Sequence, residues 1–248
     1  MKHRAFILFM VACITITVLM TGCIGKGNAY EFTKWDKEFT LHGGVEFGDT
    51  LEEAREKEIN AGMECTELSE GDRSFRVDGI VAGFSDSHIF YFCENGNDFG
   101  INAARYDIDN DANKPDILYN ADLVTEALKT KYGEPYFVFD GENLPPLKTS
   151  RVHFTYENLL GYEPGRPLSP DFEIPSDLNY EIPVYEMWIL DVGDNECVLI
   201  EHVVSGRIGN PSIHSIEYNF LEEESIIADM SGEINLTEAQ MEEMTGDL

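Results

Sequence analysis

The sequence predicts an α+β fold, in which an antiparallel meander sheet has two principal helices packed on one face. Two helical patterns, at residues 50–62 and 120–132, are separated by a stretch in which apolar residues recur at every second position. Alternating segments at residues 185–192, 197–204 and 213–221 follow the second helix. Because the strands come in groups rather than alternating with helices, an antiparallel sheet is favoured over a parallel one.

Residues 50–62 have the signals of a short helix. Thr50 and Glu53 have the spacing of a capping box, in which each side chain accepts a hydrogen bond from the other residue's backbone amide. Gly62 is suited to end the helix. The apolar stripe is thin and consists of Leu51, Ala54 and Ile59.

Residues 75–107 predict a three-stranded antiparallel meander. Apolar side chains alternate with polar or small ones on both sides of Ser85-Asp86-Ser87, which we expect to form the first turn. Asn95-Gly96 is a strong signal for the second turn, because both residues tolerate a positive φ. The third strand is expected over residues 99–106.

The helix at residues 120–132 has the clearest signals. Asn120 can cap its first turn, Lys129 and Lys131 favour its negative end, and Gly133 followed by Pro135 ends it. Its expected apolar face consists of Val124, Ala127, Leu128 and Tyr132. A short strand is expected next, at residues 136–140.

Two segments interrupt this regular pattern. Residues 141–183 contain seven of the ten prolines and are expected to form a long excursion with one strand at 151–156. Long loops of this kind often carry binding surfaces. Residues 222–248 contain nine acidic residues and no basic one, so we expect a partly disordered tail with at most one short helix capped by Thr237 and Gln240.

The N-terminus, Met1 to Cys23, has the pattern of an export signal. Lys2, His3 and Arg4 precede an uncharged apolar run from Ala5 to Met20, which is shorter than the ~20 residues of a membrane-spanning helix. The alternative is an uncleaved membrane anchor.

The residues Leu19-Met20-Thr21-Gly22-Cys23 resemble the lipobox of bacterial lipoproteins. The resemblance implies cleavage after Gly22 and a diacylglyceryl group on Cys23. Two acyl chains hold a protein stably on a membrane. The resulting organisation is a signal peptide (1–22), a lipidated tether (23–43), a single α+β domain (44–221) and an acidic tail (222–248).

Two stretches, residues 47–54 and 128–135, resemble uncharacterised lipoproteins of clostridial-type bacteria. They are also distantly similar to small outer-membrane assembly lipoproteins and to modules like the β-lactamase inhibitors. This resemblance covers about a third of the chain. It implies a non-catalytic protein-binding module.

The net charge of the chain limits the classes of molecule that it can bind. Lys and Arg number 17 against 47 Asp and Glu, which gives a net charge of −30. Such a field repels nucleic acids and anionic lipid head groups. It favours solubility at a cell surface and permits cationic partners.

The cysteines do not form a disulfide framework or a zinc ribbon. Cys13 lies in the signal segment and Cys23 is the expected lipidation site, which leaves Cys65, Cys93 and Cys197 without a CxxC spacing. One disulfide bond and three buried thiols both fit the sequence.

The common catalytic motifs, including GxSxG, HExxH and the phosphate-binding loops, do not occur. The histidines lack metal-ligand spacing. His202 lies in one predicted strand and His214 opens the next, so the two are expected to be neighbours across the sheet, as structural histidines rather than ligands.

One loop has the composition of a calcium site. Asp107, Asp109, Asp111 and Asn113 place oxygen atoms at alternate positions, which suits Ca²⁺. The loop lacks the Gly and Glu that an EF-hand needs at its sixth and twelfth positions. An Asp/Asn-rich connection between a strand and a helix is the other interpretation.

The sequence thus predicts a lipid-anchored extracytoplasmic protein without a catalytic function, which binds another protein or a cell-envelope ligand and has no cofactor. The alternative is an envelope hydrolase that uses dispersed carboxylates, with Ca²⁺ in the loop at residues 107–113. Membrane attachment comes from the lipid on Cys23 alone.

Overall fold

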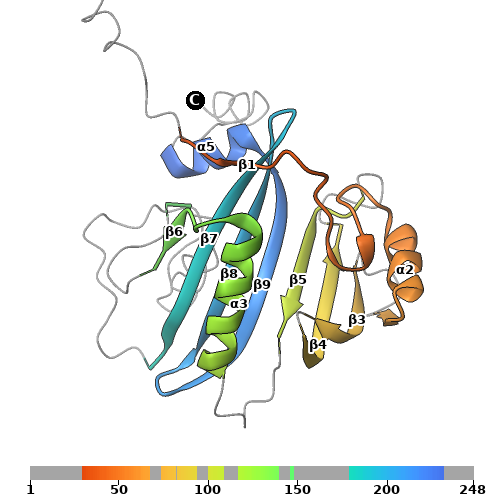
Figure 1. Ribbon diagram of the computed structural model, residues 1–248, viewed down its shortest axis with the longest axis horizontal. Helices are drawn as coiled ribbons and strands as arrows, with labels where there is room; N and C mark the ends of the chain where they lie inside the picture. The colour runs from red at the N-terminus through yellow and green to blue at the C-terminus, as the bar shows by residue number, and fades with distance from the viewer. Residues whose placement is uncertain are drawn as a thin grey trace, which may run out of the picture. The chain divides into compact units, whose positions relative to one another are not determined.

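The computed structural model describes residues 30–67, 74–81, 83–93, 100–108, 117–139, 146–147 and 179–231. Those from Phe32 onward belong to one unit (Figure 1). Its helical elements are the 3₁₀ turn η1 (His42–Gly44), α2 (Leu51–Asn60), α3 (Ile117–Tyr132) and α5 (Glu223–Ser231). Its strands are β1 (Thr33–Lys34), β2 (Glu64–Glu67), β3 (Ser74–Val81), β4 (Phe84–Phe92), β5 (Ala103–Asp107), β6 (Phe137–Val138), β7 (Glu181–Gly193), β8 (Glu196–Arg207) and β9 (Asn210–Glu222).

The described strands form one mixed but mostly antiparallel sheet. Its order is β1-β7-β8-β9-β5-β4-β3-β2, with β6 also paired to β7. Every pair is antiparallel except β1 with β7. The meander expected over residues 75–107 is confirmed as β3, β4 and β5. The described residues contain nine strands, which is more than the sequence predicts. The short strands β1, β2 and β6 leave no clear alternating pattern in the sequence.

The strands β7 and β8 bury side chains on both faces, which creates two hydrophobic cores. Trp188 of β7 and Ile200 of β8 belong to the first core, whereas their neighbours Met187 and Leu199 belong to the second. Successive side chains of a strand point to opposite faces, so the two cores lie on opposite sides of the sheet.

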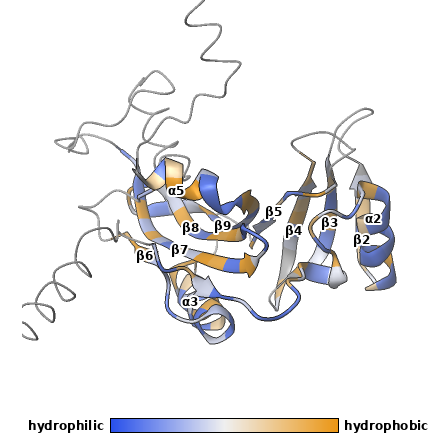
Figure 2. Ribbon diagram, turned by 90° about the horizontal axis from the view of Figure 1, so that it is seen from above, coloured by the Kyte–Doolittle hydropathy of each residue, from blue (hydrophilic) through white to orange (hydrophobic). Residues whose placement is uncertain are grey.

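The helices contribute to different cores. Val124 of α3 and Ala54 of α2 lie in the first core, whereas Ile226 of α5 lies in the second. α3 contacts β7, β8 and β9, and α2 contacts β2, β3 and η1. Figure 2 shows α3 and α5 on opposite sides of β7–β9 and also shows that α2 is largely hydrophilic.

The capping box expected for α2 is confirmed. Thr50 Oγ1 accepts a hydrogen bond from the Glu53 amide at 3.2 Å, and the Glu53 carboxylate accepts one from the Thr50 amide at 2.9 Å. The expected apolar stripe is wrong at one position, because Ile59 is 52% exposed. Its place in the packing is taken by Glu58, which is completely buried.

α3 begins at Ile117, three residues before the expected start, so Asn120 lies inside the helix and does not cap it. Leu118 and Tyr119 in this added turn are exposed. The buried face includes Val124, Leu128 and Tyr132 as expected, and also Ala121. Ala127 is exposed rather than buried.

The first turn of the meander lies earlier than residues 85–87. β4 already begins at Phe84, and Gly83 has a φ of +87°, which a glycine adopts without steric cost. A shift of register between Gly79 and Val81 accompanies this turn. A tight turn connects β7 to β8, in which Asp194 and Asn195 both have positive φ.

The acidic C-terminal segment does not begin outside the domain. α5 starts at Glu223, and Ile226 is 1% exposed in the second core. Burial of an apolar side chain holds this stretch on the sheet despite its charge. Residues 232–248, including the helix expected at Thr237–Gln240, lie outside the described residues.

Other expectations also lie outside the described residues. They concern the signal segment with Cys23, the Asn95-Gly96 turn, the strand at 151–156 and most of the excursion at 141–183. The three remaining cysteines, Cys65, Cys93 and Cys197, are described, and none of them forms a disulfide.

Candidate functional site

A cavity of about 470 Å³ lies beside α3, over the part of the sheet where β9 meets β5. Its floor is formed by Tyr106 of β5 and by Ile216 and Tyr218 of β9. These three side chains are buried. The rings of Tyr106 and Tyr218 are 4.9 Å apart between centroids, so the floor is largely aromatic.

One wall of the cavity is the side of α3. It consists of Leu123, Val124, Ala127, Leu128, Lys131 and Tyr132, which follow the helical spacing of three and four residues. Val124 and Leu128 are buried against the sheet, whereas Leu123 is 47% exposed and lies at the mouth. The wall therefore offers an apolar surface to whatever enters.

The opposite wall consists of residues 40–42, which lead into η1, and of the turn residues Gly83 and Phe84. α3 has its main contacts with β7, β8 and β9, and α2 has its own with β2, β3 and η1. β5 lies between these two parts of the sheet.

The hydroxyl groups near the cavity are neutral donors and acceptors. Burial raises the pKa of Tyr218 to about 12 and holds the pKa values of Tyr106 and Tyr132 well above the usual range. The Tyr106 hydroxyl accepts a hydrogen bond from the His42 amide at 2.8 Å. This bond ties β5 to the opposite wall.

His42 is held by a buried carboxylate. Its Nδ1 lies 2.8 Å from Glu58 Oε2, and Tyr91 donates a hydrogen bond of 2.5 Å to Glu58 Oε1. Glu58 is completely buried, whereas the His42 side chain is 27% exposed. The hydrogen bond to Glu58 raises the pKa of His42 despite partial burial.

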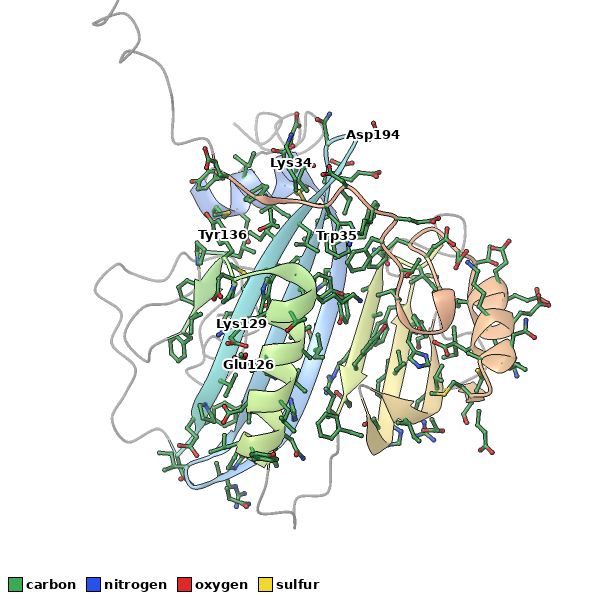
Figure 3. All side chains as sticks on the ribbon, viewed as in Figure 1. Lys34, Trp35, Glu126, Lys129, Tyr136 and Asp194 are labelled. Atoms are coloured by element: carbon green, nitrogen blue, oxygen red, sulfur yellow. The ribbon has the colours of Figure 1, made fainter. Side chains whose placement is uncertain are left out.

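Lys131 is the only lysine or arginine among the residues that line the cavity in the described part of the chain. Its Nζ lies 4.8 Å from the centroid of the Tyr132 ring, which is a cation–π distance. The Lys131 side chain as a whole is exposed, and partial desolvation of its ammonium lowers its pKa. The neighbouring residues Glu126 and Lys129 also lie on α3 (Figure 3), where Lys129 Nζ approaches Glu126 Oε1 at 4.0 Å.

A second polar cluster lies under α3, outside the cavity lining. The expectation that His202 and His214 are neighbours is confirmed, because their Nε2 atoms are 3.0 Å apart. His202 Nδ1 lies 3.1 Å from Glu186 Oε2, and Thr125 of α3 donates to the same oxygen at 2.6 Å. All three charged or titratable side chains are buried.

The predicted calcium ligands are described at one position only. Asp107 ends β5, where its Oδ1 accepts a hydrogen bond of 2.6 Å from Arg105 Nε. Asp109, Asp111 and Asn113 lie outside the described residues, as does Cys23. Within the described ranges, no group of three or more His, Cys, Asp or Glu side chains is arranged to hold a metal ion.

The sequence analysis placed part of the cavity wall, Val124, Ala127, Leu128 and Tyr132, on one face of the helix, but it did not single out Glu58 or Lys131. Glu58 looked like one more exposed acid of α2, because its partners Tyr91 and His42 are 33 and 16 residues away in the chain. Lys131 was identified only as a favourable charge at the end of a helix. The aromatic alternation in β9 was a usable signal, since it placed Ile216 and Tyr218 on one face.

The chain matches no protein-family model, and no curated protein or solved structure is significantly similar to it. None of the helices within the described ranges is long and apolar enough to cross a membrane.

Proposed function

We propose that this protein is a non-catalytic binding protein that holds a small, largely apolar ligand of the cell envelope in the cavity beside α3. The observation that carries the proposal is the cavity itself. Its volume of about 470 Å³ lies within the range of small-molecule sites, roughly 300–1,000 Å³. An apolar lining with a few polar groups is also typical of such sites.

The polar groups of the cavity support binding rather than bond cleavage. The Tyr106 hydroxyl already accepts a hydrogen bond from the His42 amide. The raised pKa values keep the tyrosines of the lining neutral near pH 7, so none of them is an activated base. These groups are suited to orient a ligand.

The proposal includes the location expected from the sequence. Lipidation at Cys23 would hold the domain at the outer side of the cytoplasmic membrane, where ligands with apolar bodies are abundant. We also propose that α2 and α3 cover the same face of the sheet, since the side chains that they bury share the first core.

Binding of a neutral apolar fluorophore, N-phenylnaphthylamine, tests the proposal. The full-length chain should bind it with saturation. Ala127→Trp should abolish binding, because Ala127 lines the cavity and is exposed, so an indole there fills the space without removing a buried side chain. Glu126→Trp is the matched control, since the Glu126 side chain is 77% exposed on the same helix. Equal binding by both variants would refute the proposal.

A second function, hydrolysis, is favoured by the contact between His42 and Glu58. Glu58 fixes the imidazole through Nδ1 at the edge of the cavity, as a carboxylate does for a general base. Under this alternative, p-nitrophenyl decanoate would be hydrolysed with saturation, and His42→Gln would abolish turnover while fluorophore binding persists. Dependence on Ca²⁺ and on Asp109 would connect the activity to the loop at residues 107–113.

A further inference from the structure

The charge of the cavity lining is not balanced. Lys131 has no carboxylate within 4.0 Å among the residues that the structure describes, although the chain contains 47 acidic residues. By contrast, Lys57 and Lys129 each lie within 4.0 Å of an acidic side chain. A lysine beside an apolar cavity without a protein counter-charge is suited to accept one from a ligand.

Other titratable groups of the lining do not supply this counter-charge. Tyr106, Tyr132 and Tyr218 are neutral because burial raises their pKa values. His42 has its own counter-charge in Glu58, whose carboxylate lies 2.8 Å from Nδ1. Lys131 therefore carries the net charge of the lining, which is positive in a strongly acidic protein.

The environment of Lys131 strengthens the attraction for an anion. Although the Lys131 side chain is exposed, its ammonium has lost part of its water, which lowers its pKa. An anionic group placed next to the ammonium would replace that lost solvation and form a charge-assisted hydrogen bond. The same ligand would bury its apolar part against Leu123, Val124 and Leu128.

We propose that the ligand is a single-chain amphiphile with an anionic head, either a carboxylate or a phosphate. This inference rests on the binding function proposed above and adds the class of ligand. The head lies on Lys131 at the mouth, and the chain extends over the floor formed by Tyr106, Ile216 and Tyr218. The volume of about 470 Å³ suits one medium-length chain rather than a diacyl lipid.

Four ligands with the same decyl chain test the proposal on the full-length protein. They are decanoate, decyl phosphate, decanol and decyltrimethylammonium, each used below its micellar concentration to displace N-phenylnaphthylamine. Decanoate or decyl phosphate should bind about two- to fivefold more tightly than decanol, which is the upper range of a solvent-exposed ion pair. The anion that binds with the higher affinity shows whether the head group is a carboxylate or a phosphate.

Substitutions in α3 distinguish the effect of the Lys131 charge on binding from the effect of the apolar cavity. Lys131→Met should bind decanoate, decyl phosphate and decanol with equal affinity, whereas Lys131→Arg should still bind the two anions more tightly than decanol. Lys129→Met is the matched control, because it removes a neighbouring lysine that already approaches Glu126. It should leave the preference as it is in the wild type.

Each contrary result has a distinct meaning. Equal affinity of the wild type for decanol and both anions, or tightest binding of decyltrimethylammonium, would overturn the anionic head while leaving the cavity as a binding site. Failure of all four ligands to displace the bound fluorophore would overturn the single-chain amphiphile as the ligand, whereas failure of the wild type to bind the fluorophore at all would refute the binding function.

Discussion

The imidazoles of His202 and His214 meet through their Nε2 atoms at 3.0 Å, and both rings are buried. His202 Nδ1 faces the Glu186 carboxylate, and the neutral tautomer that donates there has Nε2 as an acceptor. His214 then donates from Nε2. Its Nδ1 is a buried acceptor without a hydrogen-bond partner in the described structure. The row crosses three adjacent strands under α3.

This arrangement predicts acid sensitivity. Burial and the neighbouring His202 lower the pKa of His214 to about 3, whereas the pKa of this histidine in the unfolded chain is 6.5. The unfolded state therefore takes up more protons as the pH falls, and stability is lost from about pH 6.5 downwards. Between pH 7.5 and 5 this residue alone should cost about 2 kcal/mol of the free energy of unfolding.

Urea unfolding at the two pH values measures this loss. His214→Leu removes the titrating group, so its stability should change by about 2 kcal/mol less than that of the wild type over the same interval. Glu186 adds a further loss at lower pH: burial raises its pKa, but hydrogen bonds from His202 and Thr125 outweigh burial and lower it. An identical pH dependence in wild type and variant would contradict the assignment.

Glu58 should be required for stability although it lies on a surface helix. Glu58→Ala leaves the buried Tyr91 hydroxyl and His42 without their acceptor, at a cost of about 3 kcal/mol. Glu58→Gln keeps an acceptor and should cost less. Glu56→Ala, on the exposed side of α2, is the control and should change the midpoint of urea unfolding very little. Equal effects of the two alanine substitutions would refute the role of Glu58.

The same carboxylate should control the titration of His42. The hydrogen bond that His42 donates to Glu58 raises the pKa of His42, so His42 contributes stability below about pH 6.5 that is lost as the pH rises through the folded pKa. In Glu58→Gln, NMR titration should show the pKa of His42 decreasing. An unchanged pKa of His42 would mean that Glu58 is not the group that raises it.

Two glycines with similar backbone angles should respond differently to alanine. Gly133, with φ of +87°, has open space where a Cβ would lie, so Gly133→Ala should cost only the conformational strain of about 1–2 kcal/mol. Gly100 has φ of +73°, and a Cβ there would meet the Gly48 backbone oxygen at 2.2 Å. Gly100→Ala should therefore cost clearly more. Equal midpoints of thermal unfolding would show that the close approach of the two segments is absent.

Lipidation of Cys23 is tested by intact mass. The wild type should start at Cys23, carry a diacylglyceryl group and partition with membranes, whereas Cys23→Ala should be released or left unprocessed. A wild type that retains Met1 without lipid would instead support an uncleaved anchor. Cleavage without lipid would indicate a freely secreted protein.

The elements that the sequence predicted depend on local signals. The α2 capping box needs two residues three apart, and the β7–β8 hairpin needs its own turn. The meeting of His202 and His214 was predictable because β8 and β9 follow one another and pair in antiparallel register.

The elements that were missed depend on distant partners. β1 has two residues and exists because it pairs with Leu190 and Asp191 of β7. Burial of Glu58 depends on Tyr91, 33 residues away, and the cavity is lined by residues of α3, of β5 and β9 and of segments 40–42 and 83–84, which are far apart in the chain. The hydrophobic periodicity of a single segment carries no information about partners elsewhere in the chain.

The most direct test of the account is the map of NMR methyl signals that change when decanol is added. The proposal predicts shifts at Leu123, Val124, Leu128 and Ile216, which line the cavity. Ile189 and Leu199 of the second core should stay unchanged. Shifts spread equally over both cores, or absent from the cavity residues at saturation, would contradict a ligand site beside α3.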